Sequence, residues 1–253
     1  MSLTFGNLNL QDKVIITETV QFRSMANRIA TLAEVSRRPG SKFLSEEYDK
    51  KVITMNGRVL SPSASGMIGI LDDIHKNLAI SEQQLTITDG RSYTATCTKA
   101  SFPEQHYNQT IIPFSLEFIS ASPFSTGSAL SPGFGLGATV LEKAVDTTIS
   151  GSAFAEPTIR LSTAGVGDPG FGQITVAHNT TGEEVTFSGQ FSLGLEAVFD
   201  YENATVTYSG VLQDYTGSFS RWDVGSNEFT VTLSGTNPEG MTGALEYSPR
   251  YFL

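Results

Sequence analysis

Short segments in which apolar and polar side chains alternate recur through the second half of the chain. Such a period of two places one set of side chains on the buried face of a strand and the other in solvent. Turn-forming clusters separate these segments, which predicts antiparallel strands packed as a β-sandwich. The expected strands lie near Thr158, Gln173, Glu184, Leu195, Ala204, Glu228 and Gly243, and the clearest alternating sets are Ile174/Val176, Val185/Phe187, Val206/Tyr208 and Phe229/Val231/Leu233.

The first half combines strands with one helix. Strands are expected over 14–23, 51–59 and 111–119, and Asp89-Gly90 predicts the tight turn of a hairpin between 84–88 and 91–98. The helix is expected over 63–78, because Met67, Leu71, Ile74 and Leu78 share one face at the helical period, and Ser63 or Ser65 is suited to cap its start. The fold class predicted from these patterns is mainly β, with one helix in the first domain.

The charge is distributed unevenly. The net charge is −10, yet residues 1–140 hold 12 basic and 12 acidic side chains, whereas residues 141–253 hold 4 and 14. A stretch rich in Gly, Ser and Pro, Ser120–Gly137, lies between the two parts. We therefore predict an N-terminal domain over 1–120, a linker or loop over 121–143 and a C-terminal domain over 144–253, with a long loop inside a single domain as the alternative.

Composition excludes several classes of protein. The shortage of Lys and Arg disfavours general nucleic-acid binding and attraction to anionic membranes. The apolar runs are short, as in Met67–Leu71, so no membrane span is expected, and the N-terminus has no pattern of a secretory signal. A single cysteine, Cys97, excludes an intrachain disulfide and disfavours a zinc site.

No motif in the sequence predicts catalytic, cofactor-binding or metal-binding residues. The glycines of Gly165–Gly170 match a dinucleotide-binding pattern, but a strand rather than a helix is expected after them, so we interpret them as a loop, and Gly133–Gly137 as part of the linker. The remaining candidates are widely spaced histidines and adjacent carboxylates, which suit solvated faces better than a metal or glycosidase site: His75, His106, His178, Glu46/Glu47, Asp72/Asp73 and Glu183/Glu184. Calcium binding stays open, although no loop has the spacing of calcium ligands.

A carbohydrate-binding function is the alternative that the residues leave open. Trp222 is the only tryptophan, and with Asp223 it is the one candidate for an aromatic platform beside a polar group. Packing inside a sandwich or a turn explains both residues equally well. Three glycosylation sequons, at Asn108, Asn179 and Asn203, are interpreted as chance in a chain without a secretion signal. A hydrolase with distant carboxylates is a third possibility that no residue pair favours.

Four segments resemble the distal tail protein (Dit) family of long-tailed, non-contractile bacteriophages. The first is the N-terminal block of strands and helix, which ends in the hairpin at Leu85–Thr98. The second is Phe114–Phe124, in which Ala121-Ser-Pro-Phe stands where that family often has Asp, Pro and an aromatic residue. The third, Gly151–Leu161, is similar to the start of the family's second domain. The fourth comprises Phe219–Val231 and the closing Tyr247–Phe252, which resemble its last strands.

This resemblance implies both an architecture and a role. The expected fold is a tail-tube-like N-terminal β-sandwich with a helix, followed by a galectin-like C-terminal β-sandwich. The expected protein is a structural, non-enzymatic virion component without cofactor, made in the bacterial cytoplasm and located at the tail tip or baseplate. It is expected to form a hexameric ring at the distal end of the tail tube and to connect the tube to the baseplate or receptor-binding apparatus. The expected partners are tail-tube, hub and receptor-binding proteins, with DNA only passing through the channel and no membrane contact.

Overall fold

The chain divides into two compact units, which are described separately below. The computed structural model describes residues 3–252 except 23–25, 27, 35–40, 89, 104–109, 164–169, 190, 193 and 236–239. Unit 1 comprises residues 1–127 and 252–253, and unit 2 comprises residues 128–251. The division falls inside the stretch expected to be a linker. That stretch is not simply a loop, since it contributes short strands to both units.

Unit 1 is built on one antiparallel path of strands in the order β2-β1-β7-β8-β9-β6-β3. The short β10 pairs with β8 through Thr126 and Ser92. The strands are β1 (Thr4–Phe5), β2 (Leu8–Asn9), β3 (Ile15–Gln21), β6 (Lys51–Leu60), β7 (Gln83–Thr88), β8 (Arg91–Ser101), β9 (Ile111–Ser120) and β10 (Ser125–Thr126). The predicted strands at 14–23, 51–59, 84–88, 91–98 and 111–119 are therefore confirmed within a few residues. Gly90 has the positive φ of +76° that the predicted tight turn requires, while Asp89 lies outside the described residues.

The sheet of unit 1 folds over on itself to enclose a core. Phe5 in β1 and Phe118 in β9 have ring centroids 4.9 Å apart, although β7 and β8 separate their strands in the sheet. The side chains predicted to alternate on β9, Phe114, Leu116 and Phe118, are all buried. The shared strand β8 therefore joins two halves that pack face to face.

The predicted helix is α1 (Ala64–Leu78), and it packs against this core. Ser63 caps its start by accepting a hydrogen bond from the Gly66 amide at 3.1 Å. Met67, Ile74 and Leu78 are buried and Leu71 is partly buried, as the helical period predicts. The helix thereby buries its apolar stripe and presents its charged side to solvent.

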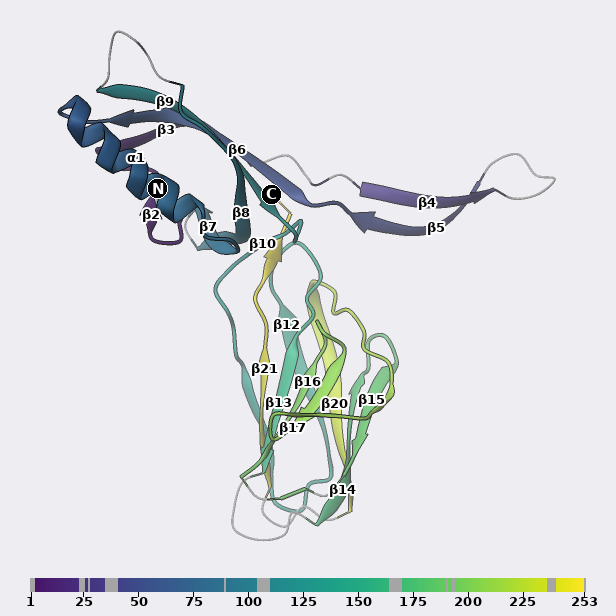
Figure 1. Cartoon of the computed structure of the whole chain (residues 1–253). Helices are drawn as coiled ribbons and strands as arrows, with labels where there is room; N and C mark the ends of the chain where they lie inside the picture. Colours follow the sequence, from purple (N-terminus) through teal and green to yellow (C-terminus); the bar gives the residue numbers. More distant parts are fainter. Residues whose placement is uncertain are drawn as a thin grey trace. The chain divides into compact units, whose positions relative to one another are not determined.

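A separate hairpin of unit 1 was not predicted from the sequence. β4 (Arg28–Glu34) and β5 (Ser41–Tyr48) pair with each other and with no other strand in the described part of the chain. Figure 1 shows this hairpin extending beyond the ends of β3 and β6, to which it is connected. Ile29, in β4, is 53% exposed. We call this hairpin the arm.

Unit 2 is a sandwich of two antiparallel sheets around one core (Figure 1). The sheet orders are β11-β21-β13-β16-β17-β18 and β12-β20-β14-β15-β19. The strands of these sheets are β11 (Gly133–Leu136), β12 (Glu142–Ile149), β13 (Thr158–Thr163), β14 (Phe171–His178), β15 (Glu183–Ser188), β16 (Glu196–Asp200), β17 (Thr205–Tyr208), β18 (Val211–Gln213), β19 (Thr216–Gly217), β20 (Gly225–Gly235) and β21 (Met241–Glu246). The short β22 (Arg250–Tyr251) is in neither sheet. The predicted strands and their inward-facing residues are confirmed, except that Tyr208 is only partly buried. The galectin-like form of this sandwich stays a prediction.

Two edge strands correct the sequence analysis. Gly133–Gly137 was interpreted as part of a linker, but Gly133–Leu136 is β11 and pairs with β21. β12 was not predicted, although it pairs with β20 along eight residues, Glu142–Ile149. Edge strands are exposed on one side and tolerate glycine or charge there, which hides the alternation that marks an inner strand.

Candidate functional site

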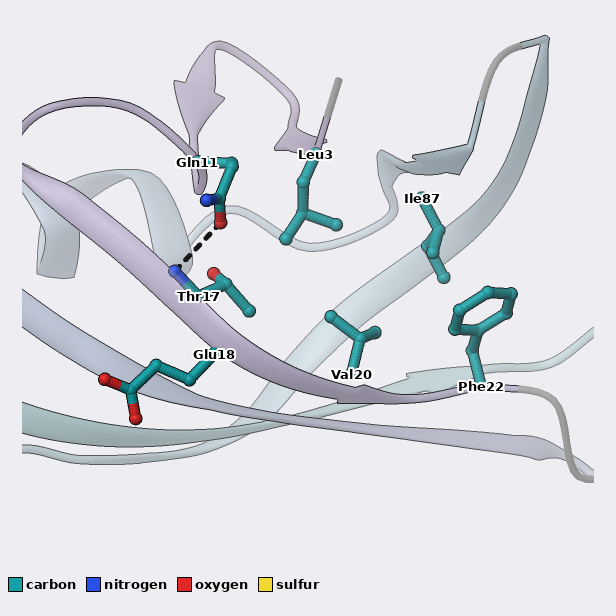
Figure 2. Close-up of a pocket in the computed structure, with 7 residues that line it drawn as sticks. All are labelled: Leu3, Gln11, Thr17, Glu18, Val20, Phe22 and Ile87. Atoms are coloured by element: carbon teal, nitrogen blue, oxygen red, sulfur yellow. Dashed lines mark hydrogen bonds between the residues drawn. The ribbon is translucent and has the colours of Figure 1, made fainter. Parts of the chain in front are cut away.

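An apolar cavity of about 300 Å³ opens on unit 1, where the two ends of its folded sheet approach each other. Figure 2 shows the side chains of Leu3, Val20, Phe22 and Ile87 directed toward a common space, while Glu18 points away from it. They come from the N-terminal segment, from β3 and the residue after it, and from β7, which are distant in sequence. Leu3, Phe22 and Ile87 are buried within the unit.

One part of the β3 edge beside this cavity is already covered. Gln11 and Thr17 also line the cavity, and the Thr17 amide donates a hydrogen bond to Gln11 Oε1 at 3.0 Å (Figure 2). The Asp12 amide donates to the Ile15 carbonyl at 2.8 Å. Further along, Val20 and Phe22 face the cavity. β3 ends the strand order of its sheet, so it presents a strand edge beside an apolar recess.

The electrostatics of the cavity are weak. Glu18 forms an ion pair with Arg58 at 3.3 Å, and both side chains are about half exposed. The other lining side chains are apolar or carry uncharged amide or hydroxyl groups. This arrangement suits the insertion of an apolar side chain and offers no paired acid and base.

The most elaborate polar cluster lies inside unit 2, around His178 at the end of β14. Asn227 Nδ2 donates to the carbonyls of Asp223 and Gly225, which turns Asn227 Oδ1 toward His178 Nε2 at 3.1 Å. Nε2 therefore carries the proton and donates. Nδ1 is left to accept from the hydroxyl of Ser220 at 2.9 Å. Burial lowers the pKa of His178, against opposing contributions from Asn227, Glu183 and Asp223, so a neutral imidazole is favoured.

Trp222 corrects the carbohydrate-platform hypothesis. Its side chain is fully buried and its ring stacks on the His178 ring, with centroids 4.5 Å apart and planes 7° from parallel. A buried ring cannot receive a sugar, so the packing interpretation holds. Asp223 is exposed, and its carbonyl serves as an acceptor for Asn227. The neighbouring Tyr201 hydroxyl has its pKa raised, chiefly by burial and further by Glu183.

The remaining candidates that the structure describes do not assemble into a site. Asp72/Asp73 and Glu183/Glu184 are exposed, whereas the side chains of Glu46/Glu47 and all of His106 lie outside the described residues. Burial raises the pKa of the Cys97 thiol, which makes the reactive thiolate scarcer. Within the described residues, no group of three or more His, Cys, Asp or Glu side chains is placed to hold a metal ion.

The structure describes two of the three sequons and only the last residue of the glycine motif. Asn179 Nδ2 donates to Thr230 Oγ1 and Asn203 Nδ2 donates to Asp200 Oδ2, so both exposed asparagines serve in turns. Asn108 lies outside the described residues, as does Gly165–Gly170 apart from its last glycine. No helix in the described part of the chain is long and apolar enough to cross a membrane.

Two segments that carried the family resemblance meet in unit 2. Gly151 and Ala153 form bridges with Arg250, which ties the segment between β12 and β13 to the end of the unit. The guanidinium of Arg250 donates to Glu156 Oε2 at 2.6 Å and to Glu202 Oε1 at 2.9 Å. The Tyr247 hydroxyl donates to the Thr148 carbonyl at 2.9 Å.

The other two resemblance segments form the body of unit 1 and its aromatic end. Phe124, which closes the Ala121-Ser-Pro-Phe segment, packs against Tyr48 and Phe252 with ring centroids 5.6 and 5.0 Å away. Phe252 is thus part of an aromatic cluster with Phe124 and Tyr48, the last residue of β5. Sequence reasoning could not place this cluster, because its three rings are far apart in the chain.

Comparisons with solved structures agree with this architecture. No protein-family model and no curated protein sequence matches the chain. A crystal structure of the Dit protein of phage SPP1, described as a paradigm of the hub adsorption apparatus in phages that infect Gram-positive hosts, matches with a TM-score of 0.73 at 10% identity and covers 98% of both chains. A chain of the phage p2 baseplate in its activated conformation with Sr matches with a TM-score of 0.47 at 7% identity, covering 95% of this chain and 94% of that one. The resemblance to the Dit family is thereby confirmed at the level of the fold: from the first strand to the last, this chain has the fold of the SPP1 Dit protein.

Proposed function

We propose that this chain is a structural component of the tail tip of a long-tailed bacteriophage. The observation that carries the proposal is the likeness in fold to the SPP1 Dit protein over 98% of both chains, which includes both units rather than one common domain. The cavity and the polar cluster of unit 2 contain no arrangement suited to catalysis, which is compatible with a structural role. In this role the chain catalyses no reaction, and its affinity for the other proteins of the tail comes from repeated protein–protein contacts.

The proposed assembly is a hexameric ring at the distal end of the tail tube, formed by unit 1. Its support is apolar surface that unit 1 leaves open, namely the cavity beside β3 and the arm with its exposed Ile29. A cyclic ring needs two different surfaces per subunit that fit each other, one on each side. A cavity beside a strand edge and a projecting hairpin are suited to be such a pair.

Charge supports the division of roles between the units. Residues 1–127 carry 12 basic and 12 acidic side chains, whereas residues 128–251 carry 4 and 14. Neutral subunits pack around an axis with little mutual repulsion, while acidic modules repel one another. We therefore infer that unit 1 forms the ring, around a channel through which DNA passes, and that unit 2 projects outward from it. The proposed partners of the ring are the tail tube, the hub and the receptor-binding proteins.

The location is tested on particles. An antibody against this chain, applied to purified virions of the phage that encodes it, is expected to label the distal end of the tail in electron micrographs. Absence of the chain from the virions, or label distributed along the tube, would contradict the proposal.

The ring interface is tested by one substitution in the cavity. The wild type is expected to form hexamers in native mass spectrometry, and Val20→Glu, which places a charge in the apolar recess, is expected to prevent them from forming. Val52→Glu is the matched control, since Val52 is already 40% exposed on β6. Hexamers that survive Val20→Glu would exclude the cavity from the interface.

A further inference from the structure

The edge strand β18 of unit 2 carries two adjacent apolar residues that nothing in the described chain covers. Val211 is 62% exposed and Leu212 is 66% exposed. β18 ends the order of its six-stranded sheet, so its second side faces no strand of the described residues. The alternation of hydrogen bonds in an antiparallel ladder turns the N–H and C=O of at least one β18 residue to that side.

The hairpin holds this edge in a defined conformation. Ser209 and Gly210 form the turn with φ of 51° and 76°, which matches a tight two-residue hairpin. Val211 pairs with Tyr208 and Leu212 with Thr207. The Tyr208 ring packs against Phe191 at 5.3 Å between centroids.

The two apolar side chains lie on opposite faces of the sheet. Val211 shares the face of Tyr208, toward the sandwich interior, and Leu212 shares the face of Thr207, toward the outside. A strand added beside β18 would therefore meet an apolar side chain on each face. Such an added strand gains main-chain hydrogen bonds from the edge and side-chain contacts from both residues.

The net negative charge of unit 2 indicates the chemistry of the segment that would pair with β18. Three of the four basic residues of unit 2 are engaged in ion pairs: Arg160 with Glu196 and Glu246, Arg221 with Glu156, and Arg250 with Glu156 and Glu202. The fourth, Lys143, donates to the Gly135 carbonyl. Asp214 directly follows β18 and is exposed. A second unit 2 would bring another 14 acidic against 4 basic residues to this edge, so pairing between copies of unit 2 is disfavoured.

We propose that β18 is a docking edge for an extended segment of a different protein, in which apolar side chains alternate with lysine or arginine. The segment adds a strand to the six-stranded sheet, covers Val211 and Leu212, and sets its cations against the acidic surface of unit 2. The inference rests on unit 2 alone and holds even where the proposed role in a phage tail fails.

The test uses the full chain and two synthetic peptides of about nine residues, one alternating Val with Lys and one alternating Val with Glu. Fluorescence anisotropy is expected to show binding of the Val-Lys peptide and at least about tenfold weaker binding of the Val-Glu peptide. The double variant Val211→Ser/Leu212→Ser, which leaves the net charge unchanged, is expected to weaken binding of the Val-Lys peptide by about tenfold or more.

The matched control lies in the same unit. Val140 and Leu141 are also adjacent and exposed, at 38% and 37%, but they precede β12 in a loop. Val140→Ser/Leu141→Ser is expected to bind the Val-Lys peptide as the wild type does. Equal loss in both double variants, unchanged binding in Val211→Ser/Leu212→Ser, or no binding by the wild type would each overturn the proposal. Dimers of the full chain in light scattering that only Val211→Ser/Leu212→Ser abolishes would assign the edge to a second copy instead, which also overturns it.

Discussion

The two units bury the apolar faces of their β-strands in different ways. Unit 2 places two sheets face to face, and its core is centred on residues such as Trp222, Phe199 and Phe229 that are fully enclosed. Unit 1 folds one continuous path of strands over on itself and leaves an apolar cavity where the two ends approach each other. It also extends an arm that pairs only with itself among the described residues.

The two units therefore differ in the surface that they leave exposed. The cavity and the exposed Ile29 of the arm give unit 1 open apolar surface, and residues 1–127 carry no net charge, which is compatible with the proposed association of its copies. Unit 2 encloses its core and leaves the apolar residues of β18 exposed, and its net negative charge disfavours contact between its copies. Three substitutions and one change of pH, taken from the largest expected effect to the smallest, test whether the two units unfold independently.

Trp222→Ala is expected to destabilise unit 2 by about 3–5 kcal/mol, because truncating a large buried aromatic leaves a cavity. Hydrogen exchange followed by mass spectrometry is expected to show lost protection in residues 128–251 and unchanged protection in residues 3–127. Val224→Ala, at a residue 46% exposed, is the control and is expected to change little. Equal loss of protection in both units would mean that they unfold together.

Gly57→Ala is expected to destabilise unit 1 by about 1–3 kcal/mol. A Cβ at Gly57 would collide with the Ile16 carbonyl of β3 and lie 2.7 Å from Phe114 Cζ. Because Trp222 is the only tryptophan, the midpoint of its fluorescence transition in urea reports on unit 2 and is expected to stay unchanged while the circular dichroism transition shifts.

Gly69 provides the opposite control within the same unit. It lies in α1, and a Cβ there would meet nothing within 4 Å. Gly69→Ala is therefore expected to stabilise unit 1 by about 0.5–1 kcal/mol. A shift of the tryptophan transition by either glycine substitution would contradict independent units.

Acidification is expected to have the smallest effect and to act on unit 2 through His178. Burial lowers its pKa below the ordinary value of 6.5, so the unfolded chain takes up the proton first as the pH falls. The stability contributed by the neutral ring is fully present above pH 6.5 and is lost as the pH drops toward the lowered folded pKa. Tryptophan-monitored unfolding between about pH 8 and about pH 5 measures this loss.

The matched variants for this prediction are His178→Gln and His75→Gln. His178→Gln is expected to flatten this part of the pH dependence while lowering stability at all pH values. His75, which is exposed on α1 and contacts Phe102, is expected to leave the profile of unit 2 unchanged when replaced. An unaltered profile in His178→Gln would remove His178 as the cause.

Much of the fold was predictable where a strand or helix has one buried face. The helix, its Ser63 cap and the inner strands of both units follow from periodicity, because each buried face repeats a local pattern. The inward direction of His178 also had a signal, since it continues the alternation of Ile174 and Val176. The partners of His178 could not be predicted locally, because Asn227 lies on another strand and the stacked Trp222 lies in a loop.

The open features of the molecule were the least predictable. The arm, β11 and β12 are exposed on at least one side, so their sequences need not alternate, and glycine or charge is tolerated there. The cavity joins Leu3, Val20 and Ile87, which come together only because the sheet folds over at β8. By itself, the sequence determined which residues face inward and how charge divides along the chain, because these depend on neighbours in sequence. Tertiary structure alone decided which edges and recesses stay open, because these depend on contacts between distant strands.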